Sequence, residues 1–198
     1  MSIYWAMDGR LERSERSRAA IVDAMLGLLR DGMVRPSAEA VAERAGVSMR
    51  TLFRHVEDLD ELFAAAVHAQ AHHLRDVHHL EPVEGTLAAR VDVVVAHRSR
   101  LFEEIGPVRR AAMREAPFHK SVAAGIERSG QDLRQQLEAM FDGELRATGP
   151  RAALAASIDV VTSWRAWEGW RSDQGLTVSE AEDAMRFALM ALLEKGAV

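Results

Sequence analysis

The residues best suited to bind a polyanion are concentrated in residues 37–56, which read SAEAVAERAGVSMRTLFRHV. Arginine can donate paired hydrogen bonds to guanine or to phosphate, and threonine can donate to phosphate or touch a thymine methyl. A helix N-terminus adds free amides and a positive dipole. We therefore take as candidate DNA contacts the residues at the second half of this segment, namely Ser48, Met49, Arg50, Thr51, Phe53, Arg54 and His55.

The apolar and small residues of the same segment have the spacing of a helix-turn-helix. Ala42 allows two short helices to approach closely, and Gly46 can adopt the positive φ that ends the first of them. Val47 can fill the corner, Ser48 can cap the second helix, and Leu52 can anchor it from beneath. The pattern predicts a motif whose second helix enters the major groove of DNA. An ordinary helical hairpin with a solvated arginine face is the alternative.

These helices belong to an expected all-α protein, because the apolar period is helical nearly everywhere and no period-2 strand is convincing. Gly and Pro pairs divide the chain into about nine helices. A small DNA-binding part is expected over 10–62 and a larger ligand-binding and dimerisation part over 82–198, joined by a connecting helix over 63–81. The expected helices lie near 12–31, 38–45, 49–55, 59–79, 84–104, 107–115, 118–147, 151–173 and 178–195.

Composition restricts the remaining classes of function. The net charge is −5 and the pI about 5.9, so any contact with DNA must be local. The chain has no cysteine, no phosphate-binding glycine loop and no His-Glu-x-x-His motif, so we expect no enzyme, although a dispersed catalytic site stays open. The N-terminus lacks a secretory pattern and no run is long enough for a membrane span, so we expect a cytoplasmic protein that does not associate with a membrane. We also expect no cofactor.

The run from Ser17 to Leu62, with AERAGVSMRTLFRHVEDLDEL at its centre, resembles the tetracycline-repressor (TetR) family of transcription regulators. The C-terminal run WRAWEGWRSDQGLTVSEAEDAMRFALMALL is similar to the last two helices of many members. Residues 82–150 match only in helical layout. The resemblance implies a cytoplasmic homodimer that binds a near-palindromic site on double-stranded DNA and responds to a small-molecule effector.

The resemblance also assigns roles by position. Ser37 matches a frequent phosphate contact, and Met49 and Arg50 match variable positions that read bases. Two residues depart from the family pattern: Phe53 replaces a tyrosine, and Leu59 stands where a lysine usually binds phosphate. Both departures remove a donor to phosphate, so we expect weaker non-specific DNA affinity.

Leu59 lies inside the acidic run Glu57-Asp58-Leu59-Asp60-Glu61. Acidic side chains beside phosphates oppose DNA binding, which would suit a helix-turn-helix protein that has lost DNA binding and acts through protein contacts. The interpretation that we favour is a capping box, with Asp58 as the N-cap and Glu61 three residues later.

Large side chains in the second part could line an effector pocket or simply fill its core. Histidine and arginine there could anchor a polar group of the ligand. The candidate ligand contacts are His97, Arg100, Phe102, Met113, Phe141, Trp164 and Trp167.

Five histidines lie on the long fourth helix or just after it. Two of them, His68 and His72, share a face at i and i+4. With His79 they could bind a metal, which would make the protein a metal-responsive regulator. No third ligand is placed by the pattern, so we predict solvated histidines and no metal site.

The last two helices carry apolar and alanine-rich stripes that could pair with their symmetry mates as a four-helix bundle. The stripes could instead be used within the core of one chain. The candidate dimer contacts are Ile158, Val161, Trp164, Phe187, Ala188 and Ala191. The main hypothesis is a repressor released from DNA by a small molecule, with activation as an alternative.

Overall fold

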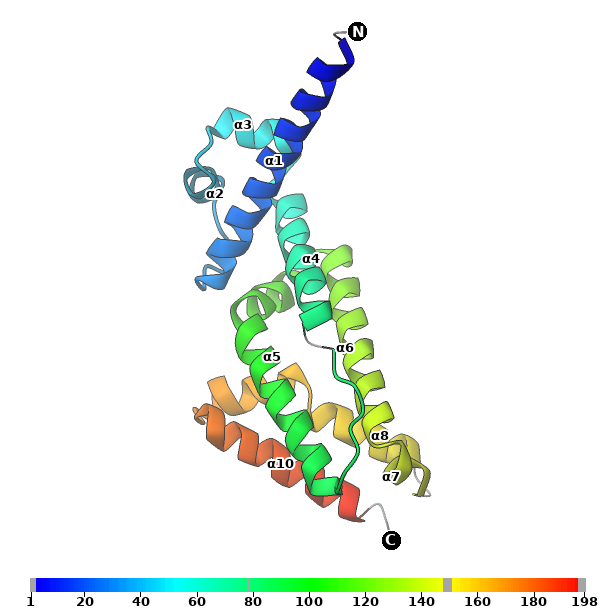
Figure 1. The fold of residues 1–198 in the computed structure, drawn as a ribbon. Helices are drawn as coiled ribbons and strands as arrows, with labels where there is room; N and C mark the ends of the chain where they lie inside the picture. Colours follow the sequence, from blue (N-terminus) through cyan, green and yellow to red (C-terminus); the bar gives the residue numbers. More distant parts are fainter. Residues whose placement is uncertain (1–2, 78, 148–150, 196–198) are drawn as a thin grey trace. The chain divides into compact units, whose positions relative to one another are not determined.

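The computed structural model describes the backbone of residues 3–77, 79–147 and 151–195, and the side chains of residues 14–74, 79–147 and 151–194. These residues form ten α-helices and one π-helical turn, with no strand among them (Figure 1), which confirms the predicted all-α fold class. The elements are α1 (Ile3–Arg30), α2 (Ala38–Ala45), α3 (Met49–His55), α4 (Leu59–Val77), α5 (Leu87–Glu115), α6 (Lys120–Met140), α7 (Asp142–Ala147), α8 (Arg151–Val161), α9 (Trp164–Glu168), η1 (Gly169–Asp173) and α10 (Val178–Lys195).

The chain forms two compact units, and each unit contains two separate stretches of the sequence. The first contains Met1–Asp76 and Gly106–Ile126, and the second contains Val77–Ile105 and Glu127–Val198. Helices α5 and α6 each contribute residues to both units. The end of α5 and the start of α6 pack with the N-terminal helices, so the compact units differ from the expected parts 10–62 and 82–198. The assignment of DNA binding to the first part and of ligand binding to the second remains a prediction.

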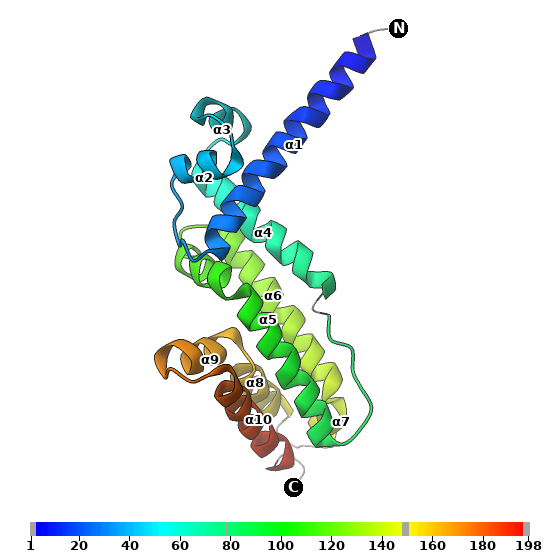
Figure 2. The ribbon, with the colours of Figure 1, turned by 60° about the vertical axis from the view of Figure 1, so that its left-hand side comes forward.

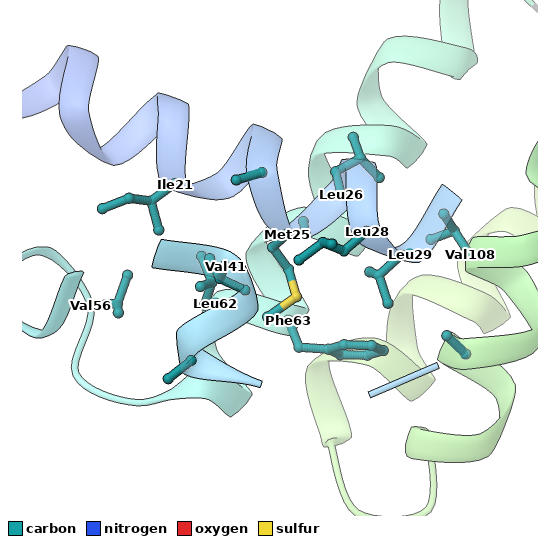
Figure 3. Packing of buried hydrophobic residues seen from close by; sticks show 14 of the residues in the cluster. Ile21, Met25, Leu26, Leu28, Leu29, Val41, Val56, Leu62, Phe63 and Val108 are labelled. Carbon is teal, nitrogen blue, oxygen red and sulfur yellow. The ribbon is translucent and has the colours of Figure 1, made fainter. Parts of the chain in front are cut away.

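The core of the first unit is built around the apolar face of α1. Ile21, Met25 and Leu29 are fully buried and lie against Val41 of α2 and Leu62 of α4 (Figure 3). Burying each such side chain stabilises the fold by about 1.5–3 kcal/mol. Because α2 and α3 both pack on α1, this core sets the orientation of the helix-turn-helix.

The second unit combines the first part of α5, the second part of α6 and all the helices from α7 onwards. Helix α10 packs on α8, and the two lie side by side in Figure 2. Phe102 of α5 meets Trp164 edge to face at 5.8 Å between ring centroids, and Trp167 at 6.2 Å. These aromatic contacts hold α9 against α5.

Helix α1 begins at Ile3 instead of near residue 12, and three further expected helix boundaries are wrong. One helix, α5, runs through Gly106-Pro107, where a break was expected. Proline removes one backbone hydrogen bond, but Val108 and Ala111 beyond it are buried in the first unit, and this packing favours a continuous helix.

At the other two places, the structure divides a segment that was expected to form one helix. The segment 118–147 separates into α6 and α7 at Phe141. The segment 151–173 separates at Thr162, whose hydroxyl donates to the carbonyl of Ile158 at 2.7 Å, while Ser163 caps α9 by accepting from the amide of Ala166. Local hydrogen bonds of this kind compete with the helix ladder and stop it.

A largely buried ion pair joins α5 to α7. NH1 and NH2 of Arg90 both donate to the carboxylate of Glu144, and NH1 also donates to the carbonyl of Met140 at 2.9 Å. The hydrogen bonds from Arg90 lower the pKa of the Glu144 carboxyl. A lowered carboxyl pKa in the folded state means that the ionised form stabilises folding.

Replacing Glu144 by glutamine should therefore lower the free energy of unfolding of the second unit by about 1.5–3 kcal/mol at neutral pH. The difference from the native chain should persist above about pH 5 and shrink as the pH falls below about 4.5, through the lowered pKa of Glu144. Urea unfolding at pH 7.0 and 4.0 measures this. A loss of stability that is the same at both pH values would contradict the assignment.

Within the described residues, no helix is both long enough and apolar enough to cross a membrane.

Candidate nucleic-acid interface

The turn between α2 and α3 is closed by Gly46, which has φ = 66° in the left-handed region. Its amide donates to the carbonyl of Glu43 at 3.1 Å, and the amide of Val47 donates to the carbonyl of Ala42 at 3.0 Å. These bonds satisfy the last carbonyls of α2 as a glycine C-cap does. The predicted positive φ at Gly46 is confirmed, and it sets the direction in which α3 leaves the turn.

One face of α3 is fixed by burial. Val41 and Leu52 are fully buried and Ala42 is 4 % exposed, so the two helices cross at small and apolar side chains. Val47 is half-buried against the same core. The four residues predicted to determine the fold of the motif (Ala42, Gly46, Val47 and Leu52) all have the predicted environment.

The opposite face of α3 is polar and open to solvent. Thr51 and His55 are half-buried at its margin. Ser48 caps the helix by accepting from the amide of Thr51 at 3.2 Å, and the two hydroxyl oxygens lie 3.0 Å apart. The predicted DNA contacts of α3 thus lie together, and the exposed ones are Met49, Arg50, Phe53 and Arg54.

The arginines of the first unit divide into two groups. Arg18 is paired with Glu61 at 3.0 Å, Arg44 is paired with Asp31, and Arg35 lies 4.0 Å from Glu115. Arg50 and Arg54 form no ion pair with any described carboxylate, and NH2 of Arg54 lies 3.4 Å from Nε2 of His55. Guanidinium groups without a protein partner are the ones that can bind phosphate or guanine at little cost.

Ser37 serves as the N-cap of α2, accepting from the amide of Ala40 at 3.3 Å. A hydrogen bond from the backbone amide of Glu39, together with one from the Ser37 hydroxyl, lowers the pKa of the Glu39 carboxyl. Contact of the Ser37 hydroxyl with a DNA phosphate remains a prediction.

The acidic run before α4 has a structural role. The amide of Glu61 donates to Asp58 at 2.7 Å, which makes Asp58 the N-cap of α4, as predicted. Glu61 accepts from the amide of Glu57 at 3.4 Å, one residue before the expected partner, and also binds Arg18. Asp58 and Glu61 are thus engaged in capping or in an ion pair, and Oδ1 of Asp60 lies 3.9 Å from Nε2 of His119, which supports a structural role for the run.

Leu59 begins α4 and is half-buried against the core of the first unit. A lysine there could keep its aliphatic stem on the same apolar surface and extend its ammonium group to solvent. If DNA lies against this helix start, Leu59→Lys should strengthen non-specific DNA affinity several-fold at 50 mM salt and steepen the salt dependence by about one phosphate contact. Fluorescence anisotropy over a salt series measures this. An unchanged affinity at low salt would contradict the expected role of this position.

The predicted ligand contacts divide into separate places. Phe102, Trp164 and Trp167 are packed together in the core of the second unit, where Phe141 is also buried, whereas Met113 belongs to the first unit. Of these residues, His97 and Arg100 line a cavity with a volume of about 620 Å³. The other described residues of its wall are His79, Leu80, Val93, Glu103 and Glu104.

The predicted dimer contacts differ in burial. Ile158 and Trp164 are buried within the core of their own unit, and Val161, Ala188 and Ala191 are half-buried. Phe187 is 78 % exposed on α10, and Val160, which was not predicted, is 64 % exposed on α8. Phe187 and Val160 are therefore the exposed large apolar side chains of α10 and α8.

The histidines do not come together as a metal site within the described residues, where no three metal-ligating side chains are grouped. His68 contacts the carbonyl of Ser121 at 3.3 Å, and His79 contacts Glu81 at 2.8 Å. His72 and His73 are exposed, and His78 lies outside the described residues.

The fold has well-matched counterparts among solved structures. A TetR-family transcriptional regulator from Streptomyces coelicolor superposes with a TM-score of 0.74 at 23% identity, over 92% of this chain and 82% of that one. The chain has the fold of TetR-family transcriptional regulators. A transcriptional regulator from Rhodococcus superposes with a TM-score of 0.70 at 22% identity (93% and 98% covered), and Salmonella enterica GusR with 0.61 at 19% (90% and 96%).

The sequence itself matches no protein-family model and no curated protein. The chain thus shares its fold with these three structures at sequence identities of 19–23%. Fold does not fix function, so the role of the protein has to be argued from the chemistry of α3 and of the second unit.

Proposed function

We propose that the protein is a DNA-binding transcription regulator that reads the major groove with α3. The observation that carries this proposal is the pair of exposed guanidinium groups, Arg50 and Arg54, on a helix whose other face is locked by Leu52. The first can reach base edges from the helix start, and the second can reach phosphate. Ser48 and Thr51 add hydroxyls at the N-terminus of the same helix, where the dipole favours anions.

We further propose that the protein acts as a homodimer. Val160 and Phe187 place exposed apolar surface on two helices that pack together, α8 and α10. A second copy covering this surface would give a four-helix bundle. The two copies of α3 would then meet successive major grooves about 34–36 Å apart on a near-palindromic site.

Ligand control is the third part of the proposal. The cavity lined by His97 and Arg100 offers about 620 Å³ for a small molecule. Helices α5 and α6 belong to both compact units, so they provide a covalent route from the cavity to the DNA-binding part. An effector that favours a dimer geometry less suited to DNA would release a repressor from its site.

The test is a gel shift of the folded, dimeric protein with the DNA that flanks its own gene, at 50 mM salt. We expect a specific complex that survives excess unrelated DNA and is weakened at 200 mM salt. If the folded dimer gives no specific complex at low salt, the proposal fails. A protein that acts through protein contacts would then be favoured.

A further inference from the structure

The corner between α3 and α4 carries an arginine that comes from a third helix. Arg18 of α1 reaches the first turn of α4, where its NH2 donates to Oε1 of Glu61 at 3.0 Å. The core beneath the pair explains this contact, because Ile21 of α1 and Leu62 of α4 are buried in one cluster (Figure 3). Arg18 precedes Ile21 by about one turn of helix, so its guanidinium lies at the corner that directly follows α3.

Both members of this ion pair are open to solvent. The side chain of Arg18 is 50 % exposed and that of Glu61 is 46 % exposed. Water and salt screen an ion pair of this kind, so it contributes little to the stability of the fold. A phosphate offers the same guanidinium a charge-assisted and often bidentate hydrogen bond. Exchanging Glu61 for a phosphate would therefore cost Arg18 little.

The two partners differ in what each keeps when they separate. Oε2 of Glu61 also accepts from the amide of Glu57 at 3.4 Å. Glu61 lies in the first turn of α4 as well, where the helix dipole favours an acidic group. Among the described residues, Arg18 has no second acceptor for its guanidinium. Glu61 thus stays stabilised without Arg18, whereas Arg18 needs another anion.

The position of this corner is suited to contact with the DNA backbone. Helix α3 has seven residues and is about 10 Å long. The major groove is about 12 Å wide and is bordered by phosphates on both sides. When a helix this short lies in the groove, the residues at its end come close to one of the bordering strands. Arg54 in the last turn of α3 is exposed there, and Arg18 is the next cation beyond it.

We propose that Arg18 is a further DNA-binding residue, which Glu61 holds in the free protein and which binds a backbone phosphate in the complex. This inference rests on the proposed function and adds to it a contact from outside α3. Phosphates carry no sequence information, so the contact would strengthen binding to all DNA equally. The choice between sequences would still be made by α3.

Arg18→Gln in the full chain tests the phosphate contact. Fluorescence anisotropy with a labelled duplex of unrelated sequence gives the affinity between 50 and 200 mM salt. We expect the variant to bind about three- to tenfold more weakly at 50 mM salt. Its loss of affinity over the salt series should be about three- to fourfold smaller than that of the native chain, which is the effect of one phosphate contact. The native salt dependence in this variant would overturn the contact.

Arg30→Gln is the matched control on the same helix. Arg30 is exposed at the end of α1, about 18 Å along the helix from Arg18. This distance exceeds the range over which surface charges act in salt, so the affinity should stay within about twofold of the native value. An equal change of salt dependence in both variants would show a general effect of charge and would contradict a contact made by Arg18.

Glu61→Gln tests the exchange of partners. The glutamine keeps an oxygen for the amide of Glu57 and the backbone amide that Asp58 caps. It should raise DNA affinity for two reasons, because it releases Arg18 and because it removes a negative charge from beside the phosphates. Repeating the substitution in the Arg18→Gln chain isolates the second reason, and the gain there should be at least about threefold smaller.

An ion pair that only fastens α1 to α4 would remain intact on DNA. Glu61→Gln would then change the affinity by the same factor with and without Arg18, which would overturn the exchange. Glu57→Gln is the matched control, since it removes a charge from the same acidic run and forms no ion pair with a described arginine. Its effect should be the same in both backgrounds.

Guanidinium unfolding of the same chains without DNA reports folding alone. The midpoint should change little in each variant, because the substituted side chains are exposed. A folded native chain that binds no duplex at low salt would refute the proposed function and this inference with it. Native binding together with an unchanged salt dependence in Arg18→Gln would refute the inference alone.

Discussion

A chain in which Arg50 and Thr51 are both replaced by alanine should bind its specific DNA site about 100-fold or more weakly than the native chain. Each good contact to a base or phosphate contributes about 1–3 kcal/mol, and these two residues lie at the N-terminus of α3. The stability should change little, because Arg50 is exposed and the amide of Thr51 keeps its bond to Ser48. Fluorescence anisotropy with a labelled duplex measures the affinity.

The control for charge is Arg114→Ala, which removes an exposed arginine of the same compact unit outside α3. It should leave the affinity within about twofold of the native value at 150 mM salt, because a distant surface charge is largely screened. If the double variant binds as tightly as the Arg114 variant while remaining folded, α3 is not the reading helix.

Leu52→Ala should lower the free energy of unfolding of the first unit by about 2–5 kcal/mol. Leu52 is fully buried between α3 and the core, so the shorter side chain leaves a cavity beneath the recognition helix. DNA affinity should also fall, since α3 loses the anchor that fixes its direction. Guanidinium unfolding followed by circular dichroism measures the stability.

Met49→Ala is the matched variant on the exposed face of α3, and it should change the stability by less than about 0.5 kcal/mol. The comparison separates packing from helix propensity, since both variants place alanine in the same short helix. A Leu52→Ala chain as stable as Met49→Ala would mean that α3 is not held by its apolar face.

The local structure of the helix-turn-helix could be predicted from the sequence because short-range chemistry determines it. Gly46 is needed for a positive φ and Ser48 for a cap, and both requirements involve neighbours within a few residues. The same is true of the cap made by Asp58. The breaks between helices were harder to predict. Pro107 lies inside α5, because packing on distant residues outweighs the local tendency of proline to end a helix.

Long-range pairing could not be predicted. The sequence contains many arginines, and only the fold separates Arg44 and Arg18, which are bound to carboxylates, from Arg50, which has no such partner. The burial of Arg98 in α5 was missed for the same reason, although one signal was present. Arg98 occupies a position in the apolar period of α5 together with Val94 and Phe102, where a charged residue is unexpected.

The candidate site therefore contains fewer donors to DNA than the sequence indicated. Ser37 serves as the N-cap of α2, Phe53 lacks a hydroxyl, and Leu59 is packed on the core, which leaves the exposed arginines of α3 as the main donors. Binding that depends on few phosphate contacts should have a shallow salt dependence. Specificity would then come from base contacts and from the spacing of two copies.

Hydroxyl-radical footprinting of the DNA that flanks the gene tests the central claim most directly. The account predicts two protected patches on one face of the duplex, one helical turn or about 34–36 Å apart, that disappear when Arg50 and Thr51 are replaced by alanine. No protection by the folded dimer at low salt, or the same protection by the double variant, would contradict it.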